Sequence, residues 1–426
     1  MNTAYTNCII LDGTENMTPQ RGKAILTDGG VITDIVPDSA IPAGFTQVDL
    51  GGKYILPGLI NLHVHLAGSG KPKKKQSDPV KLVKLITSNA LMRTLGKKMV
   101  AGYAKTQLMS GVTTIRTVGG IADFDTFVRD EINSGRLTGP RILASNMAVS
   151  VHGGHMAGSL AYEAATPEEA AAFVDKIARE KPVIIKLMIT GGVLDAEKVG
   201  EPGVLRMPPE LVKAACDRAH ELGFKVAAHV ESPEGVRVAL ENGVDSIEHG
   251  AKPTDDIINL FKEKNAFQVS TLSPALPFAM FDRSVSHATY EQQENGKIVF
   301  DGIISLAKAC LENGISVGLG TDTACPYVTQ YDMWRELCYY VKYCGVSEKF
   351  ALYSATLLNA TLAGIGNETG SIEKGKKAEM IVTRENPLEN LQALRNLDMV
   401  IMRENIIRSP KVKKIPEVET ELDKWL

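Results

Sequence analysis

Short runs of apolar residues alternate with segments of helical periodicity along most of the chain. A strand buried in a parallel sheet is apolar on both faces, whereas a helix that covers a sheet shows apolar residues three and four positions apart. The runs that fit buried strands are 56–66, 111–120, 141–150, 182–192, 225–232, 245–250, 267–273 and 315–322. Eight strands that alternate with helices predict an α/β fold, a closed (β/α)8 barrel of the TIM type.

The segments between these runs begin and end as helices do. Thr166 precedes Pro167 and Glu169, which predicts an N-cap, a first helical residue and a capping box. Gly223 follows a segment that opens with prolines and is expected at that helix's C-terminus. The alternative is a doubly wound open sheet, but no GxGxxG turn follows the first strand.

The two ends of the chain differ from the middle. Residues 1–56 form short strand patterns broken by glycine and proline, with no helical period between them. After a helix near 348–364, similar strand patterns return in 366–426. We therefore expect 1–56 and 366–426 to fold together as one small composite β-sandwich domain, beside a barrel of residues 57–365.

Composition narrows the class of protein. The 426 residues are 44% hydrophobic and 23% charged, with a formal net charge of −3, so no basic footprint for nucleic acid is visible. No apolar stretch reaches the roughly 18 residues of a membrane helix, and the N-terminus has no basic region before an apolar core. The six cysteines form no CxxC pair. We expect a cytoplasmic protein with reduced thiols and no membrane partner.

Polar side chains that could perform chemistry stand at or near the carboxyl ends of the predicted strands. They are His63, His65, Lys186, His229, His249 and Asp322. Taken singly, His63, His65 and His249 also fit hydrogen-bonded core histidines, and Asp322 also fits a cap of the next helix. Together they fall at the end of a barrel where active sites are built.

Lys186 is the hardest of the six to explain structurally. It lies within VIIKLMI, and an ammonium among such neighbours is costly to bury unless it is paired or neutralised. Four imidazoles and a carboxylate suit zinc-like divalent metals. A lysine of depressed pKa is nucleophilic, and its carbamate with carbon dioxide offers two oxygens that can bridge two cations.

These motifs resemble, in order and spacing, those of the amidohydrolase superfamily, specifically the metal-dependent prolidases and related dipeptidases and carboxypeptidases, a subgroup related to imidazolonepropionase. The resemblance covers essentially the whole chain. It rests on LGGKYILPGLINLHVHL, GVTTIRTVGG, VIIKLMITGG, KVAAHVES, DSIEHG, GLGTD and SATLLNATLAGIGNETGSIEKGKKAEMIV.

The resemblance implies a binuclear centre. His63, His65 and Asp322 would bind one divalent ion, His229 and His249 the other, and carboxylated Lys186 would bridge the two ions, expected to be zinc. A metal-held hydroxide would attack the substrate, with Asp322 as general base and then general acid. The implied reaction is hydrolysis of the amide bond of a small substrate, a dipeptide or N-acyl amino acid with a free carboxylate. The resemblance also implies a homo-oligomer.

The chain departs from the family at two positions. Asn61 stands where the family usually has aspartate, which should affect the orientation of the ligands more than the ligands themselves. Prolidase-like members often carry an aromatic residue after the histidine of the fifth strand, to help hold the substrate carboxylate, whereas this chain has Val230, Glu231 and Ser232. Glu231 could instead favour a cationic group on the substrate.

Two loops are expected at the mouth of the barrel. His152 and His155, in VHGGHMAG after the third strand, are candidates for substrate contact, the alternative being a structural loop. The loop after the first strand carries Lys71 and three further lysines at 73–75. It is expected to be a solvated lid, with steering of an anionic substrate as the alternative.

Two other functions stay open at this point. One is a mononuclear deaminase or cyclic-amide hydrolase of the same superfamily, similar to imidazolonepropionase. The other is a non-catalytic scaffold that has lost its metals. Lys186 favours the binuclear hydrolase over the first, and the complete ligand set argues against the second.

Overall fold

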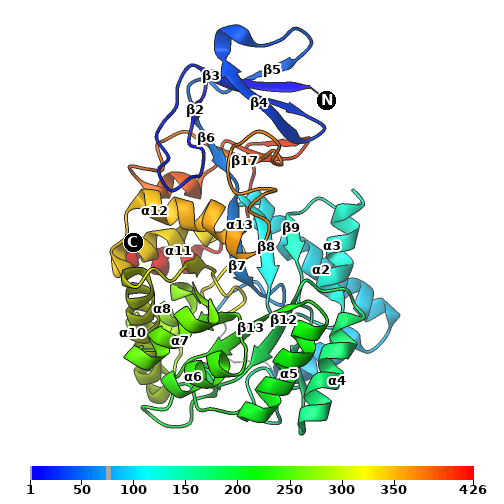
Figure 1. The fold of residues 1–426 in the computed structure, drawn as a ribbon, viewed down its shortest axis with the longest axis vertical. Helices are drawn as coiled ribbons and strands as arrows, with labels where there is room; N and C mark the ends of the chain where they lie inside the picture. Colours follow the sequence, from blue (N-terminus) through cyan, green and yellow to red (C-terminus); the bar gives the residue numbers. More distant parts are fainter. Residues whose placement is uncertain (1, 73–77) are drawn as a thin grey trace.

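The computed structural model describes residues 2–72 and 78–426. A ring of strands surrounded by helices forms the lower part of Figure 1, and a smaller, mostly β part lies above it. The strands of the ring are β7 (Leu59–Val64), β8 (Val112–Thr117), β9 (Arg141–Leu143), β10 (Ala148–Ser150), β12 (Ile184–Met188), β13 (Lys225–Val230), β14 (Ser246–His249), β15 (Phe267–Ser270) and β16 (Val317–Leu319). Each of the eight predicted runs contains at least one of them, and all pair in parallel.

The third predicted strand is divided into β9 and β10, which belong to the two sheets that make up the ring. β9 pairs with β8, and β10 pairs with β12 and with the short β11 (Ala161–Glu163). On the opposite side, the Asp322 amide donates to the His63 carbonyl at 2.8 Å. A Cβ at Gly320 would lie only 2.5 Å from the His63 Cβ, so the last strand approaches the first too closely for any larger residue. The predicted α/β barrel is confirmed.

Helices cover the outside of the ring, as the apolar spacing predicts. They are α2 (Ala90–Met109), α3 (Phe124–Asn133), α4 (Pro167–Ala178), α5 (Pro209–Glu221), α6 (Pro233–Glu241), α7 (Asp255–Lys264), α10 (Tyr290–Glu312), α12 (Glu348–Tyr353) and α13 (Asn359–Leu362). The remaining α-helices are α1 (Pro79–Thr87), α8 (Leu272–Met280), α9 (Arg283–Ser286), α11 (Met333–Tyr339) and α14 (Pro416–Leu422). Thr166 caps α4 by accepting from the Glu169 amide, and Gly223 follows α5 with φ of +82°.

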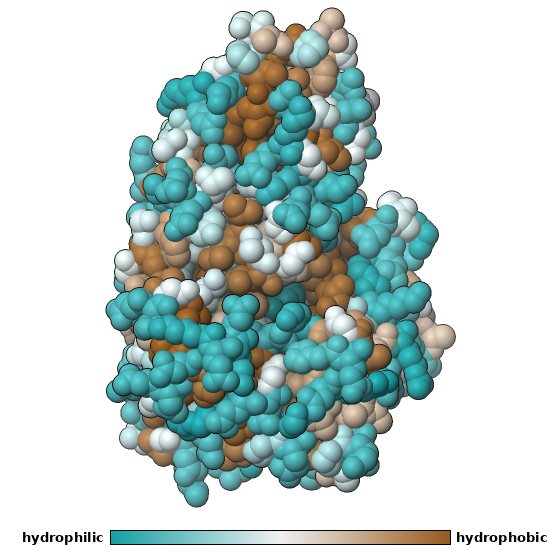
Figure 2. All heavy atoms as spheres, in the orientation of Figure 1, coloured by the Kyte–Doolittle hydropathy of each residue, from teal (hydrophilic) through white to brown (hydrophobic). Residues whose placement is uncertain are grey.

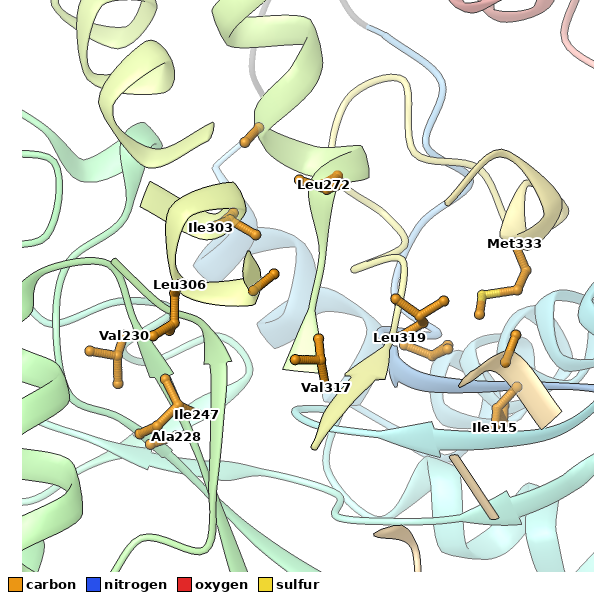
Figure 3. Packing of buried hydrophobic residues seen from close by; sticks show 14 of the residues in the cluster. Ile115, Ala228, Val230, Ile247, Leu272, Ile303, Leu306, Val317, Leu319 and Met333 are labelled. Carbon is orange, nitrogen blue, oxygen red and sulfur yellow. The ribbon is translucent and has the colours of Figure 1, made fainter. Parts of the chain in front are cut away.

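The barrel core lies between the strands and these helices. Figure 3 shows Leu306 and Ile303 of α10 beside Val230, with Ile247 on the neighbouring strand. On the outer face drawn in Figure 2, hydrophilic residues cover most of the barrel, and hydrophobic surface gathers toward the upper part. Among the described residues, no helix combines the length and the apolar composition that crossing a membrane requires.

The upper part draws its strands from both ends of the chain. One sheet has the order β4-β3-β1-β5, and the other has the order β19-β18-β17-β6-β2. The strands are β1 (Thr3–Thr6), β2 (Ile9–Ile10), β3 (Lys23–Asp28), β4 (Val31–Pro37), β5 (Thr46–Asp49), β6 (Tyr54–Pro57), β17 (Glu379–Thr383), β18 (Met399–Met402) and β19 (Asn405–Arg408). Because β6 pairs with β17, we infer that the segments 1–56 and 366–426 form one composite domain, whose borders stay a prediction.

Candidate active site

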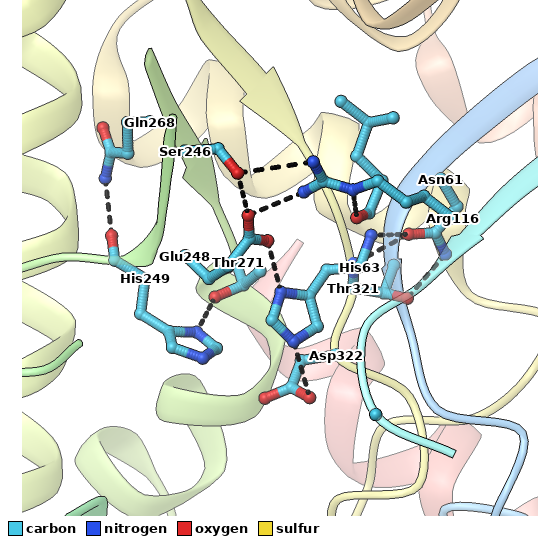
Figure 4. Close-up of polar contacts among 12 residues, drawn as sticks. Asn61, His63, Arg116, Ser246, Glu248, His249, Gln268, Thr271, Thr321 and Asp322 are labelled. Carbon is cyan, nitrogen blue, oxygen red and sulfur yellow. Dashed lines mark hydrogen bonds and ion pairs between the residues drawn. The ribbon is translucent and has the colours of Figure 1, made fainter. Parts of the chain in front are cut away.

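The carboxyl ends of the barrel strands bring four histidines and an aspartate together, of which Figure 4 shows His63, His249 and Asp322. The His63 ring centroid lies 5.3 Å from that of His65 and 4.8 Å from that of His249. The His229 ring lies 4.7 Å from the His249 ring. Asp322 Oδ1 is 3.1 Å from His65 Nε2 and 3.5 Å from His63 Nε2. Residues that are far apart in the sequence therefore form one buried cluster.

Each imidazole of this cluster has one nitrogen that contacts a polar group of the protein. The contacts are His63 Nδ1 to Glu248 Oε2 at 2.7 Å, His65 Nδ1 to the Gly119 carbonyl at 2.7 Å, His249 Nδ1 to Thr271 Oγ1 at 2.6 Å, and His229 Nε2 to the Gly191 carbonyl at 3.2 Å. A carbonyl or carboxylate accepts only from N–H, which fixes the tautomer of those rings. The second nitrogen of His63, His65 and His229 then has a free lone pair, the arrangement typical of histidines that bind a metal, whereas the Thr271 hydroxyl can donate or accept and does not fix the His249 tautomer.

Lys186 lies on β12 and is 1% exposed. Its Nζ has no hydrogen-bond partner within the described part of the chain. Burial lowers the pKa of its amine to about 8, although Glu248 and Asp322 act against this shift. An unpaired buried amine beside four oriented imidazoles fits a group that is completed by carbon dioxide and metal ions.

The protonation states suit divalent cations as well. Burial lowers the pKa of His63 and of His229 well below the usual range and that of His249 to about 4, so these rings are neutral at pH 7. Burial alone raises the pKa of Asp322, but the imidazoles of His63 and His65 outweigh it and hold that pKa below its usual range. The cluster thus presents neutral nitrogens and an ionised carboxylate, the forms that metals bind.

The backbone at the cluster is held in an uncommon conformation. His249 has φ of +66° and Asp322 has φ of +55°, in the left-handed region that non-glycine residues rarely adopt. Asn61 fixes the strand ends nearby: its Oδ1 accepts from the amides of Thr321 at 3.0 Å and His63 at 3.3 Å, and its Nδ2 donates to Thr321 Oγ1 at 2.7 Å. Asn61 therefore ties the first strand to the last.

Sequence reasoning missed a buried ion pair behind His63. The Glu248 carboxylate, 0% exposed, accepts from Arg116 Nη2 at 2.7 Å and from Ser246 Oγ at 2.8 Å, besides its contact with His63 (Figure 4). Arg116 Nε also donates to the Leu62 carbonyl at 2.7 Å. Arg116 and Glu248 both stand within predicted buried strands. A charged residue in such a strand is the signal that singled out Lys186, and the same signal could have identified this pair.

A cavity opens beside the cluster, with about 510 Å³ of empty space when the adjoining open solvent is included. His229, His249 and Asp322 border it on one side. Its apolar wall consists of Met156, Val193, Leu194, Pro274, Ala275, Phe278, Val299 and Ile303. Cys325 also lines it and donates its thiol to Asp322 Oδ2 at 3.7 Å. A cavity with an apolar wall and one polar end suits a small amphiphilic substrate.

The two predicted histidines of the third loop take different positions. His155 lines the cavity, with its ring stacked on that of His229 at 4.1 Å and its Nδ1 2.5 Å from Asp195 Oδ2. His152 is 98% exposed, lies 3.3 Å from Glu163 and does not line the cavity. Substrate contact by His152 stays a prediction. The residue that fixes His155, Asp195, lies in a loop with no periodic pattern, and no sequence signal pointed to it.

Glu231 lines the cavity as well, and its Oε2 accepts from the Val193 amide at 3.0 Å. Burial, together with the negative charges of Asp322 and Asp195, raises the pKa of this carboxyl well above its usual range. Of the lysine-rich loop, Lys71 is exposed, with its Nζ 3.7 Å from Glu417 Oε1, and the lysines at 73–75 lie outside the described residues.

The sequence pattern of the amidohydrolase family matches residues 54–407, from the strand before β7 to β19. The chain belongs to the amidohydrolase family. The protein is therefore an enzyme, a metal-dependent hydrolase of carbon–nitrogen bonds. The solved structures that the chain resembles confirm the predicted similarity to the prolidase-like subgroup.

Two such structures and one curated relative show the range of similarity. A putative prolidase from Bifidobacterium longum is 36% identical, with a TM-score of 0.87 over 99% of this chain and 98% of that one. A Xaa-Pro dipeptidase with methionine bound in its active site is 29% identical, with a TM-score of 0.82 over 96% of this chain and 100% of the other. The ochratoxinase of Aspergillus niger is 26% identical over 88% of this chain and 80% of its own length.

Proposed function

We propose that the amidohydrolase uses two divalent metal ions, zinc in the first place, to hydrolyse the amide bond of a dipeptide or N-acyl amino acid with a free carboxylate. The observation that carries this proposal is Lys186. Its amine is buried, has no hydrogen-bond partner among the described residues, and lies beside the cluster of four imidazoles, each of which contacts a protein group through one nitrogen. A site for one ion does not explain this buried amine. A site for two ions does explain it, because the carbamate of the lysine could bridge them.

The six residues divide into two ligand sets. His63, His65 and Asp322 would hold one ion, His229 and His249 would hold the other, and Lys186, as a carbamate, would supply oxygens to both. The carboxylate of Asp322 and the nitrogens of His63 and His249 lie within 4.8 Å of one another. Two bound cations supply an acidic water and a polarised substrate carbonyl.

The remaining chemistry falls to side chains of the chain itself. Asp322 is ionised and borders the cavity, so it accepts the proton of the attacking water and passes it to the leaving nitrogen. Asp195 holds Nδ1 of His155, which leaves the other ring nitrogen to hydrogen-bond the substrate. Arg116 and Glu248 keep His63 in its tautomer and orientation.

The relatives support a peptide-like substrate. A dipeptidase that is 29% identical binds methionine, an amino acid with an apolar side chain, in its active site. The apolar wall of Pro274, Phe278 and Ile303 offers a place for such a side chain.

Metal analysis and one substitution test the proposal. Purified enzyme should contain about two zinc-like ions per chain and cleave members of a library of dipeptides and N-acyl amino acids. Lys186→Ala should lose metal and activity together and recover part of both with a short carboxylic acid, whereas Lys252→Ala, which changes an exposed lysine, should behave as wild type. One ion per chain would support the deaminase or cyclic-amide alternative, and none would support a scaffold. A fully active Lys186→Ala variant without added acid refutes the bridge.

A further inference from the structure

Glu231 is held firmly at the carboxyl end of β13. Its amide donates to Thr190 Oγ1 at 3.0 Å, and its Oε2 accepts from the Val193 amide at 3.0 Å. The loop that carries these partners packs directly onto it, because a Cβ at Gly203 would lie 2.3 Å from the Glu231 carbonyl carbon. The side chain therefore has one defined position, on the wall of the cavity.

The carboxyl group in that position lacks a cationic partner. Within residues 2–72 and 78–426, no lysine or arginine forms an ion pair with Glu231, and none lines the cavity. A cationic group of a bound substrate that reaches this wall would therefore meet a carboxyl group that no lysine or arginine of the described chain already pairs.

The distance to the histidines limits where that positive group sits on the substrate. The ligand atoms of Glu231, His229 and His249 lie within 4.8 Å of one another. Since we assign both histidines to a metal that acts on the scissile carbonyl, the partner of Glu231 must lie within a bond or two of that carbonyl. In an aminoacyl group, the carbon next to the carbonyl carries the α-ammonium.

We propose that Glu231 binds the free α-ammonium group of the substrate, so that the enzyme selects dipeptides with a free amine and an apolar N-terminal residue over substrates whose amine is acylated or missing. This inference rests on the proposed function and narrows its substrate class. The side chain on the same α-carbon then meets the apolar wall of Phe278, Val299 and Ile303. An N-acyl substrate has no charge to offer at this point and leaves the carboxylate unpaired.

A matched pair of substrates tests the inference on the zinc-loaded enzyme. We expect wild type to cleave a leucyl dipeptide at least about 100-fold more efficiently, in kcat/KM, than the same dipeptide with its amine acetylated. Glu231→Gln keeps the shape and removes the charge, so kcat/KM for the free amine should fall about 100-fold while that for the acetylated substrate changes less than about threefold. Glu234→Gln, at an exposed glutamate on α6, is the control and should match wild type.

The zinc content of Glu231→Gln distinguishes a residue that binds substrate from one that binds metal. If Glu231 were a metal ligand, Glu231→Gln would bind less zinc than wild type, and that result overturns the inference. Equal losses of kcat/KM on both substrates, or a preference for the acetylated one, also overturn it while the proposed function stands.

Calorimetry with isopentylamine needs no turnover. Zinc-loaded wild type should bind this amine at least about tenfold more tightly than Glu231→Gln does, and equal affinities overturn the inference even if neither substrate is cleaved. Failure to cleave any amide, by contrast, counts against the proposed function.

Discussion

The composite β part of the molecule and the mouth of the barrel both exclude water, yet they bury opposite kinds of side chain. In the β part, Tyr5, Ile25 and Ile32 from the N-terminal segment pack against Met380 and Ile401 from the C-terminal one. At the barrel mouth the buried groups are Lys186, Arg116, Glu248, Asp322 and four histidines. The β part joins the two ends of the chain through apolar packing, whereas the mouth collects charge.

The difference separates a region whose packing stabilises the fold from a region whose buried polar groups lower its stability. The mouth contains an unpaired amine and two non-glycine residues in the left-handed region, each of which costs folding free energy. Sites of this kind persist because the rest of the structure holds them in place. Substitutions in the two regions should therefore change the unfolding free energy of the metal-free protein in opposite directions.

The largest change is expected in the β core. Ile401 on β18 is 0% exposed, so Ile401→Ala should lower the unfolding free energy by about 2–5 kcal/mol, through lost burial and a cavity. Urea denaturation with chelator present measures this loss. The zinc-loaded variant should keep wild-type kcat/KM at temperatures where it is folded. A large loss of activity in folded protein would show that the β part shapes the site.

Lys186→Met should act in the other direction. Removing a buried amine that has no hydrogen-bond partner among the described residues should stabilise the metal-free protein by about 1–3 kcal/mol, while activity is lost. Lys252→Met, at an exposed lysine, should change stability by less than about 0.5 kcal/mol. If Lys186→Met is less stable than wild type, the amine has a partner in solution.

The pH dependence of that gain has a defined sign. The Lys186 pKa is about 8 in the folded protein and 10.5 for a free lysine, so between these values the unfolded chain binds more protons. Wild-type stability therefore rises with pH in this window relative to Lys186→Met, by up to about 1.4 kcal/mol per pH unit. Denaturation curves at pH 8, 9 and 10 should show the advantage of Lys186→Met shrinking. A constant difference would contradict the lowered pKa.

Sequence patterns predicted the barrel because each strand carries its own local signal, an apolar run with a polar residue at its end. The contact between Arg116 and Glu248 joins β8 to β14, and only the closed ring brings these strands near each other. The positions of His152 and His155 depend on the path of one irregular loop, which periodicity does not encode. Local patterns thus located the polar groups, and the closed structure decided which of them meet.

The smallest change is expected at Asn61. The family usually has aspartate at this position, and the hydrogen bonds of Asn61 in the structure could also be made by an aspartate. In Asn61→Asp, one carboxylate oxygen still accepts from the amides of Thr321 and His63, and the Thr321 hydroxyl can turn to donate to the other. Three donors stabilise an ionised carboxylate, so the unfolding free energy should change by less than about 1 kcal/mol.

Asn61→Leu is the matched contrast, since it keeps the volume and removes all three bonds. It should cost about 1–3 kcal/mol and lower kcat/KM, because Thr321 precedes Asp322 and fixes where that carboxylate lies. Chemical denaturation and kcat/KM on both variants measure the contrast. Equal behaviour of the two would mean that the join between β7 and β16 relies on packing at Gly320 and on the His63–Asp322 backbone bond. The amide of Asn61 would then contribute little to the position of the Asp322 carboxylate.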